Sequence, residues 1–401
     1  MKKTNIHLLS ITIASLFLAN CSGTQTNDDS IKFETKQSLG ESLFFDKNLS
    51  LTRKTSCATC HDPEHAFIDA RFNKKAVDQS VFVDGAFSVG DDGFSLGGRN
   101  APTASYAKFS PDFNATALKG GQFHDGRADD LKGQAGGPPL DGAEMQMPDK
   151  TAVVERIQEN SEYIASFELH YGEDIFDDIN KTYDAMAEAI AKFEKTDIFA
   201  PFDSKYDKML AGEYTFNRDE DAGYALFFSN ANTNCTTCHS LNSKGEAFSK
   251  EVFSNYDYEN IGVPRNITAM NARVALGLQD ENATFKGVGA TLNNSEHFGK
   301  TKVPTLRNIA VTAPYMNNGQ FMKLRTVLEF YDHMAGLGHH TNPETGEAWG
   351  ENDHNSTINF EVLKETKELT DTKIRQLEAF LRTLTDAKFE HLMPELEPIS
   401  E

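Results

Sequence analysis

Apolar side chains return every three to four positions in several stretches of the chain, which is the spacing of an amphipathic helix. The clearest of these stretches are residues 181–195, 217–228, 325–334 and 371–384, with a shorter one around 39–45. Asn217 and Glu220 predict a capping box at the start of the second stretch, and Asp371 is the expected N-cap of the last. Strand-like alternation is scarce, so we expect a mainly α fold with few strands.

Two domains are expected from the distribution of these helices. Residues 71–115 are rich in Gly, Asp, Ser and Asn with little periodicity, which predicts loops. The expected order is a polar tether at 22–35, domains at 36–200 and 206–390 joined near 196–215, and a tail at 391–401.

Composition narrows the class of protein. Hydrophobic residues make up 39% and charged residues 25% of the chain, as in globular proteins with real cores. The net charge of −21 argues against binding to nucleic acid, which needs clustered Lys and Arg to neutralise phosphates.

The first 21 residues have the pattern of an export signal. Lys2 and Lys3 precede an apolar core from Leu8 to Ala19 that is too short to span a bilayer. The segment ends at Cys21, as in bacterial lipoproteins, whose cysteine is lipidated; an ordinary secretory signal is the alternative. Both interpretations place the protein in the periplasm, and its expected membrane attachment is through this lipid alone.

One five-residue motif occurs twice, and it uses four of the five cysteines. Cys-x-x-Cys-His attaches a c-type haem: the cysteines form thioethers and the histidine ligates the iron. The two copies are Cys57-Ala-Thr-Cys60-His61 and Cys235-Thr-Thr-Cys238-His239. Two haems are therefore predicted, with His61 and His239 as proximal ligands, rather than a zinc or thioredoxin-like pair. Outside the motif no wider internal repeat is expected.

Two further blocks carry a resemblance to a known family. The first runs from Gly121 through His124, Asp125, Gly126 and Arg127, and continues to Glu144 and Met145; the second comprises Val303 to Asn308 and Thr312 to Met316. With the haem motifs, they resemble the bacterial di-haem cytochrome c peroxidases and their MauG-like relatives over roughly residues 36–390. The resemblance implies two cytochrome-c-like domains packed face to face. The first would carry the peroxidatic haem and the second the electron-transfer haem.

For the first haem, the resemblance implies a distal face formed by Gln134, Pro138 and Glu144. Cleavage of H2O2 needs a proton moved from one oxygen to the other, and a positioned carboxylate can act as base and then acid. A solvated surface glutamate is the alternative for Glu144. Many relatives block this haem with a distal histidine, but residues 66–123 contain none, and His65 is expected to face outward. The first haem is therefore predicted to be open to peroxide.

For the second haem, the resemblance places the sixth ligand at Tyr331. Met334 is the competing ligand and His333 a weaker third, while a core aromatic residue is the alternative role of Tyr331. His124 stands where relatives usually have the tryptophan between the haems, and it is expected there as a polar contact. Trp349, the only tryptophan, lies in a polar loop.

The resemblance also implies a Ca²⁺ between the domains, with Asn100, Thr312 and Pro314 as oxygen ligands. His339, His340 and His354 fall in a Gly- and Asn-rich stretch and receive no function.

The expected activity is reduction of H2O2 with electrons from a small cytochrome c or cupredoxin. The alternatives are a MauG-like oxidase that modifies side chains of a partner protein, often Trp, and a pure electron-transfer cytochrome. The protein could be a monomer or a homodimer.

Overall fold

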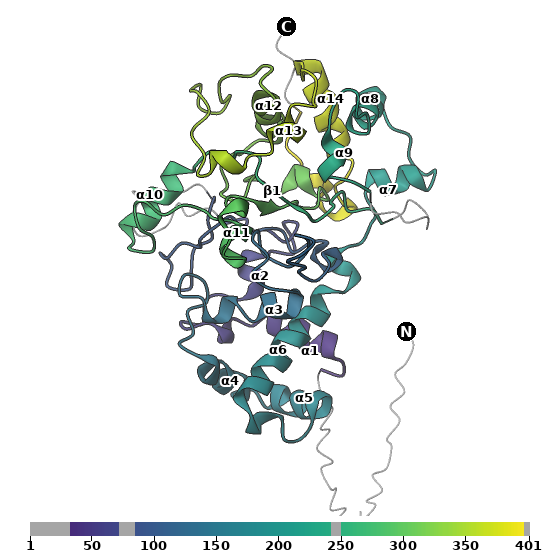
Figure 1. Ribbon diagram of the computed structural model, residues 1–401. Coiled ribbons are helices and arrows are strands. Elements are labelled where there is room, and N and C mark those ends of the chain that lie inside the picture. The colour runs from purple at the N-terminus through teal and green to yellow at the C-terminus, as the bar shows by residue number, and fades with distance from the viewer. Residues whose placement is uncertain (1–32, 72–84, 242–249, 397–401) are drawn as a thin grey trace, which may run out of the picture.

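A computed structural model describes residues 33–71, 85–241 and 250–396. Figure 1 shows two helical lobes, stacked one above the other, with α1 to α6 in the lower lobe and α7 to α14 mainly in the upper one. The one sheet in the described ranges has two antiparallel strands, β1 (Tyr258–Glu259) and β2 (Thr301–Lys302), with Tyr258 opposite Lys302. The expected mainly α fold with few strands is confirmed.

The lobes correspond to the two halves of the chain. The first contains α1 (Lys36–Phe45), α2 (Cys57–Cys60), α3 (Leu131–Ala135), α4 (Lys150–Gln158), α5 (Ser161–Tyr171) and α6 (Ile179–Glu194). The second contains α7 (Lys205–Leu210), α8 (Arg218–Phe227), α9 (Cys235–Cys238), α10 (Ile267–Ala275), α11 (Val288–Thr291), α12 (Leu324–Met334), α13 (Phe360–Leu363) and α14 (Asp371–Arg382). Between residues 85 and 115 the only helical element is a 3-10 turn, Ala107–Phe109, so the predicted loop is confirmed there.

The export signal, its Cys21 and most of the tether lie outside the described residues. Among the helices that are described, none combines the length and the apolar character needed to cross a membrane.

The predicted helices are present as α1, α6, α8, α12 and α14. The capping box of α8 is confirmed, because Asn217 accepts from the backbone of Glu220 and Glu220 accepts from that of Asn217. The N-cap predicted for α14 is wrong: Thr370 is the cap, and its hydroxyl accepts from the N–H of Lys373. Asp371 is the first helical residue, where its charge interacts favourably with the helix dipole.

Each lobe is built around one close helix crossing. A Cβ added at Gly40 of α1 would lie 1.8 Å from the carbonyl oxygen of Ala189 in α6, and one at Gly223 of α8 would lie 1.8 Å from that of Gln376 in α14. Only glycine lets the backbones approach so closely. Gly-x-x-Leu-Phe-Phe occurs at both crossings, at 40–45 and 223–228. The crossings therefore repeat in sequence as well as in structure, and this repeat is wider than the haem motif.

Two apolar cores hold the lobes. The first packs α1 and α6 with Phe67 and Phe199, and the second packs α8, α12 and α14 with Phe253. Phe389 is 2% exposed and belongs to the first core, although it follows α14 in the chain. The C-terminal segment thus returns to complete the first lobe.

A buried polar network joins the lobes. Tyr106 of the first lobe donates through its hydroxyl to Asp386 (2.5 Å), whose second carboxylate oxygen accepts from the Asn308 side chain (2.8 Å). Arg307, 1% exposed, makes two hydrogen bonds to Asp207 (2.6 and 2.9 Å). Every charged group in this network has a partner, so the network fixes the relative position of the lobes.

Removing one donor from this network should be costly. Tyr106→Phe leaves a buried oxygen of Asp386 without its donor, so we expect the free energy of unfolding to fall by about 1–3 kcal/mol. Urea denaturation of the holoprotein measures the change. Tyr315→Phe is the control, because its hydroxyl donates to the neutral carbonyl of Ile309 and its loss should cost about 1 kcal/mol. Equal losses in the two variants would contradict a special role for Asp386.

Candidate active site

The first Cys-x-x-Cys-His motif forms a single helical turn, α2. The N–H of His61 donates to the carbonyl of Cys57 (2.9 Å), which ends the turn and aims the imidazole away from it. Nδ1 of His61 lies 3.2 Å from the carbonyl oxygen of Phe67. A carbonyl can only accept, so Nδ1 carries the proton and Nε2 keeps the lone pair that binds iron.

The second motif has the same geometry. The N–H of His239 donates to the carbonyl of Cys235 (2.9 Å), and its Nδ1 donates to the carbonyl of Phe253 (2.9 Å). Phe67 and Phe253 both have φ of +56°, a conformation that turns each carbonyl toward its histidine. One segment in each lobe thus orients the predicted proximal ligand in the same way.

A Pro-Thr pair stabilises each of the two segments whose carbonyls accept from the histidines. The hydroxyl of Thr103 donates to the carbonyl of Ala66 (2.6 Å), and that of Thr305 donates to the carbonyl of Val252 (2.7 Å). These residues follow Pro102 and Pro304. The expectation of no repeat beyond the haem motif is therefore wrong: helix crossing, haem turn and Pro-Thr support all recur.

The residues present fit two c-type haems. The four motif cysteines are free thiols in the described part of the chain, although each pair lies within one turn. Cys57 packs on the first apolar core and Cys235 on the second, so burial raises the pKa of both thiols. Thiols held apart from one another beside an apolar core, with an imidazole nitrogen free, suit thioether attachment and iron ligation.

Glu144 lies in a tightly folded segment after Pro138. The N–H of Met145 donates to the Pro138 carbonyl (3.2 Å), and the carbonyl of Glu144 accepts from the N–H of Asp91 (2.8 Å). Met145 is 2% exposed in the first core, so the backbone on which Glu144 stands is fixed. The residue after Glu144 is thereby bonded to Pro138.

The Glu144 carboxyl is half-buried. Burial, with a smaller contribution from Asp141, raises its pKa to about 7, while Arg127 opposes the shift. After burial, the charge of this carboxyl is one of the smaller causes that raise the pKa of the Cys57 and Cys60 thiols. A carboxyl with a pKa near neutrality can both take and return a proton.

Gln134 is half-buried on α3, four residues before Pro138. His65 donates to Asp62 (2.8 Å), and its side chain is 44% exposed, so it faces outward as expected. With no histidine between 66 and 123, the sequence supplies no such ligand to cap the first haem in this region.

Glu194, at the end of α6, is a buried acidic residue that was not among the site residues predicted from the sequence. It is 5% exposed, burial raises its pKa to about 8, and its charged form would act on the Cys57 thiol. Its Oε2 has no hydrogen-bond partner. The helical spacing offered a signal, because Glu194 lies four residues after the buried Ile190 and so continues the inward face of the helix.

Three side chains of α12 were candidate ligands of the second haem. Burial, with smaller contributions from Cys238 and Cys235, raises the pKa of the Tyr331 hydroxyl. Met334 packs against Gly262, where an added Cβ would lie 2.5 Å from its methyl group. His333 stacks on Trp349, with ring centroids 5.6 Å apart.

Trp349 packs against more aromatic rings than the polar loop sequence around it predicts. Its ring lies against Phe321 and Phe330 as well as His333, and its Nε1 donates to the carbonyl of His339 (2.5 Å). The sole tryptophan is thus half-buried beside α12.

His124 lies at the junction of the lobes. Its Nε2 donates to the carbonyl of Asn100 (3.0 Å), and its own carbonyl accepts from the N–H of Lys302 of the second lobe (2.9 Å). Burial lowers its pKa to about 4, so it is neutral at physiological pH. The N–H of Asn100 donates to the carbonyl of Asn317 (3.0 Å), which brings Asn100 against the loop that follows Pro314.

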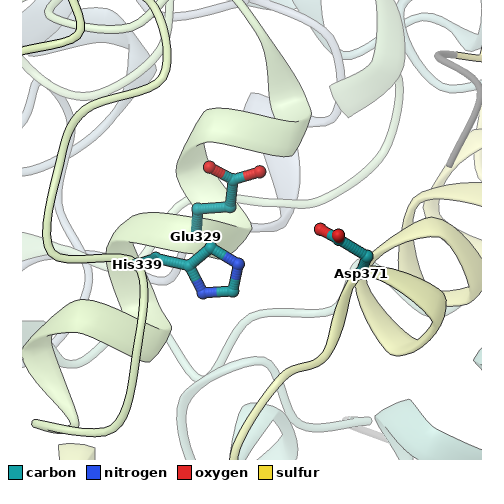
Figure 2. Close-up of side chains that lie close together, drawn as sticks. All are labelled: Glu329, His339 and Asp371. Carbon is teal, nitrogen blue, oxygen red and sulfur yellow. The ribbon is translucent and has the colours of Figure 1, made fainter. Parts of the chain in front are cut away.

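Figure 2 shows a group that could be taken for a metal site: Glu329 from α12, Asp371 from α14 and His339 from the loop between them. Arg325 already bonds both carboxylates, to Glu329 at 2.7 Å and also to Asp371. Arg325 therefore links α12 to α14 through ion pairs, and these two carboxylates need no metal ion to balance their charge.

Comparisons with known proteins agree with this geometry. A family model described as di-haem cytochrome c peroxidase matches residues 34–215. The chain is 43% identical over 363 residues to methylamine utilization protein MauG of Paracoccus denitrificans (strain Pd 1222), covering 89% of this chain and 90% of that protein. It is 31% identical over 287 residues to cytochrome c peroxidase Ccp of Escherichia coli (strain K12), covering 71% of this chain and 50% of that protein. The crystal structure of the di-haem peroxidase BthA from Burkholderia thailandensis E264 matches with a TM-score of 0.74 at 28% identity, covering 90% of this chain and 88% of that one.

Proposed function

The chain belongs to the di-haem cytochrome c peroxidase family, whose members include MauG-like oxidases, and on that premise we propose that it reduces H2O2 to water. The family carries two c-type haems, and the two Cys-x-x-Cys-His turns fit them. The observation that carries the proposal is the Glu144 carboxyl, which stands on a backbone held by Asp91 and Pro138 and has its pKa raised to about 7 by burial.

Cys57, Cys60 and His61 would hold the first haem, and its iron would supply peroxide binding and the redox chemistry. Glu144 would take one proton of the peroxide and return it to the oxygen that leaves as water. Gln134 orients the peroxide by hydrogen bonding. Two electrons and two further protons complete the reduction to a second water, so that H2O2 + 2e⁻ + 2H⁺ gives 2H2O.

The electrons enter through the second lobe, from a small cytochrome c or cupredoxin. In this proposal Tyr331 ligates the second haem and His124 is a polar contact between the lobes, rather than a redox relay. Asn100, Thr312 and Pro314 supply oxygen ligands to a structural Ca²⁺. Export to the periplasm and a lipid at Cys21 rest on the sequence pattern of residues 1–21.

A second candidate function is oxidation of a partner protein. A tyrosinate ligand favours high oxidation states of the second haem over delivery of electrons, and the 43% identity to a MauG protein points the same way. In this case reduced cytochrome c would be oxidised only slowly.

The experiment is an absorbance and EPR titration of the as-isolated holoprotein with H2O2. We expect one high-spin and one six-coordinate low-spin haem, and loss of the high-spin signal after one equivalent without prior reduction. Reduced cytochrome c then separates the two candidates by its rate of oxidation. Two low-spin haems that do not react with peroxide would instead identify an electron-transfer cytochrome.

A further inference from the structure

A cavity of about 70 Å³ lies where the two lobes meet. Arg99 and Phe87 enter it from the first lobe, while Ile261, Val263 and His354 line it from the second. One water needs roughly 15 Å³ of such volume, so the cavity has room for a carboxylate group with a few waters.

Three polar atoms of the cavity walls are buried without a hydrogen-bond partner. They are Nε of Arg99, Nε2 of His354 and Oδ1 of Asn318. Buried polar groups in native proteins are nearly always paired, so three such atoms around one cavity indicate an occupant. The guanidinium offers a donor and the imidazole can offer a second, which suits an anion.

Among the described residues, no carboxylate forms an ion pair with Arg99. Its guanidinium lies 3.8 Å from the centre of the Phe285 ring, and Nη1 donates to the neighbouring carbonyl of Gly98 (2.5 Å). The nearby Asp353 is already used, by Arg265 (2.5 Å) and by the N–H of Phe285 (2.9 Å). Burial lowers the pKa of Arg99 to about 10, which still leaves it charged at neutral pH. Because the guanidinium is partly buried and its Nε is fully enclosed, a counter-ion beside it is favourable.

The cavity adjoins the pocket of the second haem. Ile261 and Val263 pack on the second apolar core together with Cys235. Gly262, between them, contacts Met334 on α12. Glu259, which also lines the cavity, acts electrostatically on the thiol of Cys238. The cavity therefore borders the space that a haem bound at these cysteines would fill.

We propose that Arg99 and His354 bind a propionate carboxylate of the second haem in this cavity, so that a first-lobe arginine sets the charge environment of the second-lobe cofactor. The propionate is tethered through the thioethers, so it occupies the site without the entropic cost that a free anion would meet. The inference uses the two haems of the family and does not depend on any reaction with peroxide.

The test is spectroelectrochemical titration of both haems in the holoprotein, without H2O2. Arg99→Gln removes a positive charge beside the second haem, which favours Fe(III). We expect its Fe(III)/Fe(II) equilibrium to shift about tenfold toward Fe(III), or about 59 mV for a one-electron couple. Arg99→Lys, which keeps the charge, should shift it less than threefold. Arg53→Gln is the control, because Arg53 is an exposed first-lobe arginine paired with Glu159, and it should change neither potential.

A second measurement distinguishes a haem propionate in the cavity from a free carboxylate taken up from solution. The wild-type potential is measured while acetate is varied at fixed ionic strength. A bound propionate predicts no dependence on acetate, whereas a dependence would show that a free anion fills the cavity and would overturn the proposal. An unchanged second-haem potential in Arg99→Gln, or a shift confined to the first haem, would overturn it as well. The acetate arm needs no variant, so it can overturn the proposal even where Arg99→Gln fails to fold.

Discussion

Glu144→Gln should slow the reaction of the first haem with H2O2 by about 10²- to 10⁴-fold, the usual contribution of a positioned acid–base group. Glutamine keeps the size of the side chain but cannot take a proton from peroxide. The backbone of residue 144 is held by Asp91 and by the neighbouring Met145, so the substitution should leave the fold intact. Stopped-flow absorbance with excess H2O2 measures the rate.

The pH dependence of the same rate provides an independent check. Glu144 must be ionised to act as the base, and burial raises its pKa to about 7, so the wild-type rate should rise with pH and level off above this value. Glu144→Gln should lose that rise. Glu155→Gln, an exposed residue on α4, is the matched control and should retain both the rate and its pH profile. A wild-type rate in Glu144→Gln would remove the carboxyl from the mechanism.

Tyr331→Met should raise the midpoint potential of the second haem by on the order of 0.1 V or more, because axial ligands set haem potentials over a wide range. Phenolate stabilises Fe(III), whereas a thioether favours Fe(II). The variant should also pass electrons from a reduced cytochrome c more readily, as in a peroxidase with a reducible second haem. Spectroelectrochemistry and near-infrared absorption of the ferric protein report the potential and the ligand.

Met334→Leu separates the two candidate ligands on α12. Met334 packs against Gly262, so its loss should leave the spectrum and potential of the second haem unchanged. If Met334→Leu alters the spectrum and Tyr331→Met does not, the ligand assignment is reversed, and with it the argument for MauG-like chemistry.

The helices and both haem turns could be predicted because their information is local. The 3.6-residue spacing of α6 and α14 and the two Cys-x-x-Cys-His motifs each lie within one short window of sequence. The internal repeat was missed because its parts are short and unequally spaced. Pro102-Thr103 follows its haem motif more closely than Pro304-Thr305 follows the second, so a fixed period does not reveal it.

The electrostatic features could be predicted only in part. Glu144 was found through the resemblance of its block, and its raised pKa depends on burial that one sequence does not show. The sequence shows Arg99 but not whether a carboxylate pairs with it. That depends on Asp353, which lies more than 200 residues away and bonds to Arg265 and Phe285 instead. Likewise, the clamp of Arg325 between Glu329 and Asp371 needs two helices brought together by tertiary packing.

The return of Phe389 to the first core has a consequence for biogenesis. The lobe that is synthesised first lacks one of its buried aromatic rings until nearly the whole polypeptide has been made. Its core is therefore completed only near the end of synthesis, although its Cys-x-x-Cys-His motif is made early. The first lobe thus stays incompletely packed for longer than its position in the chain would suggest.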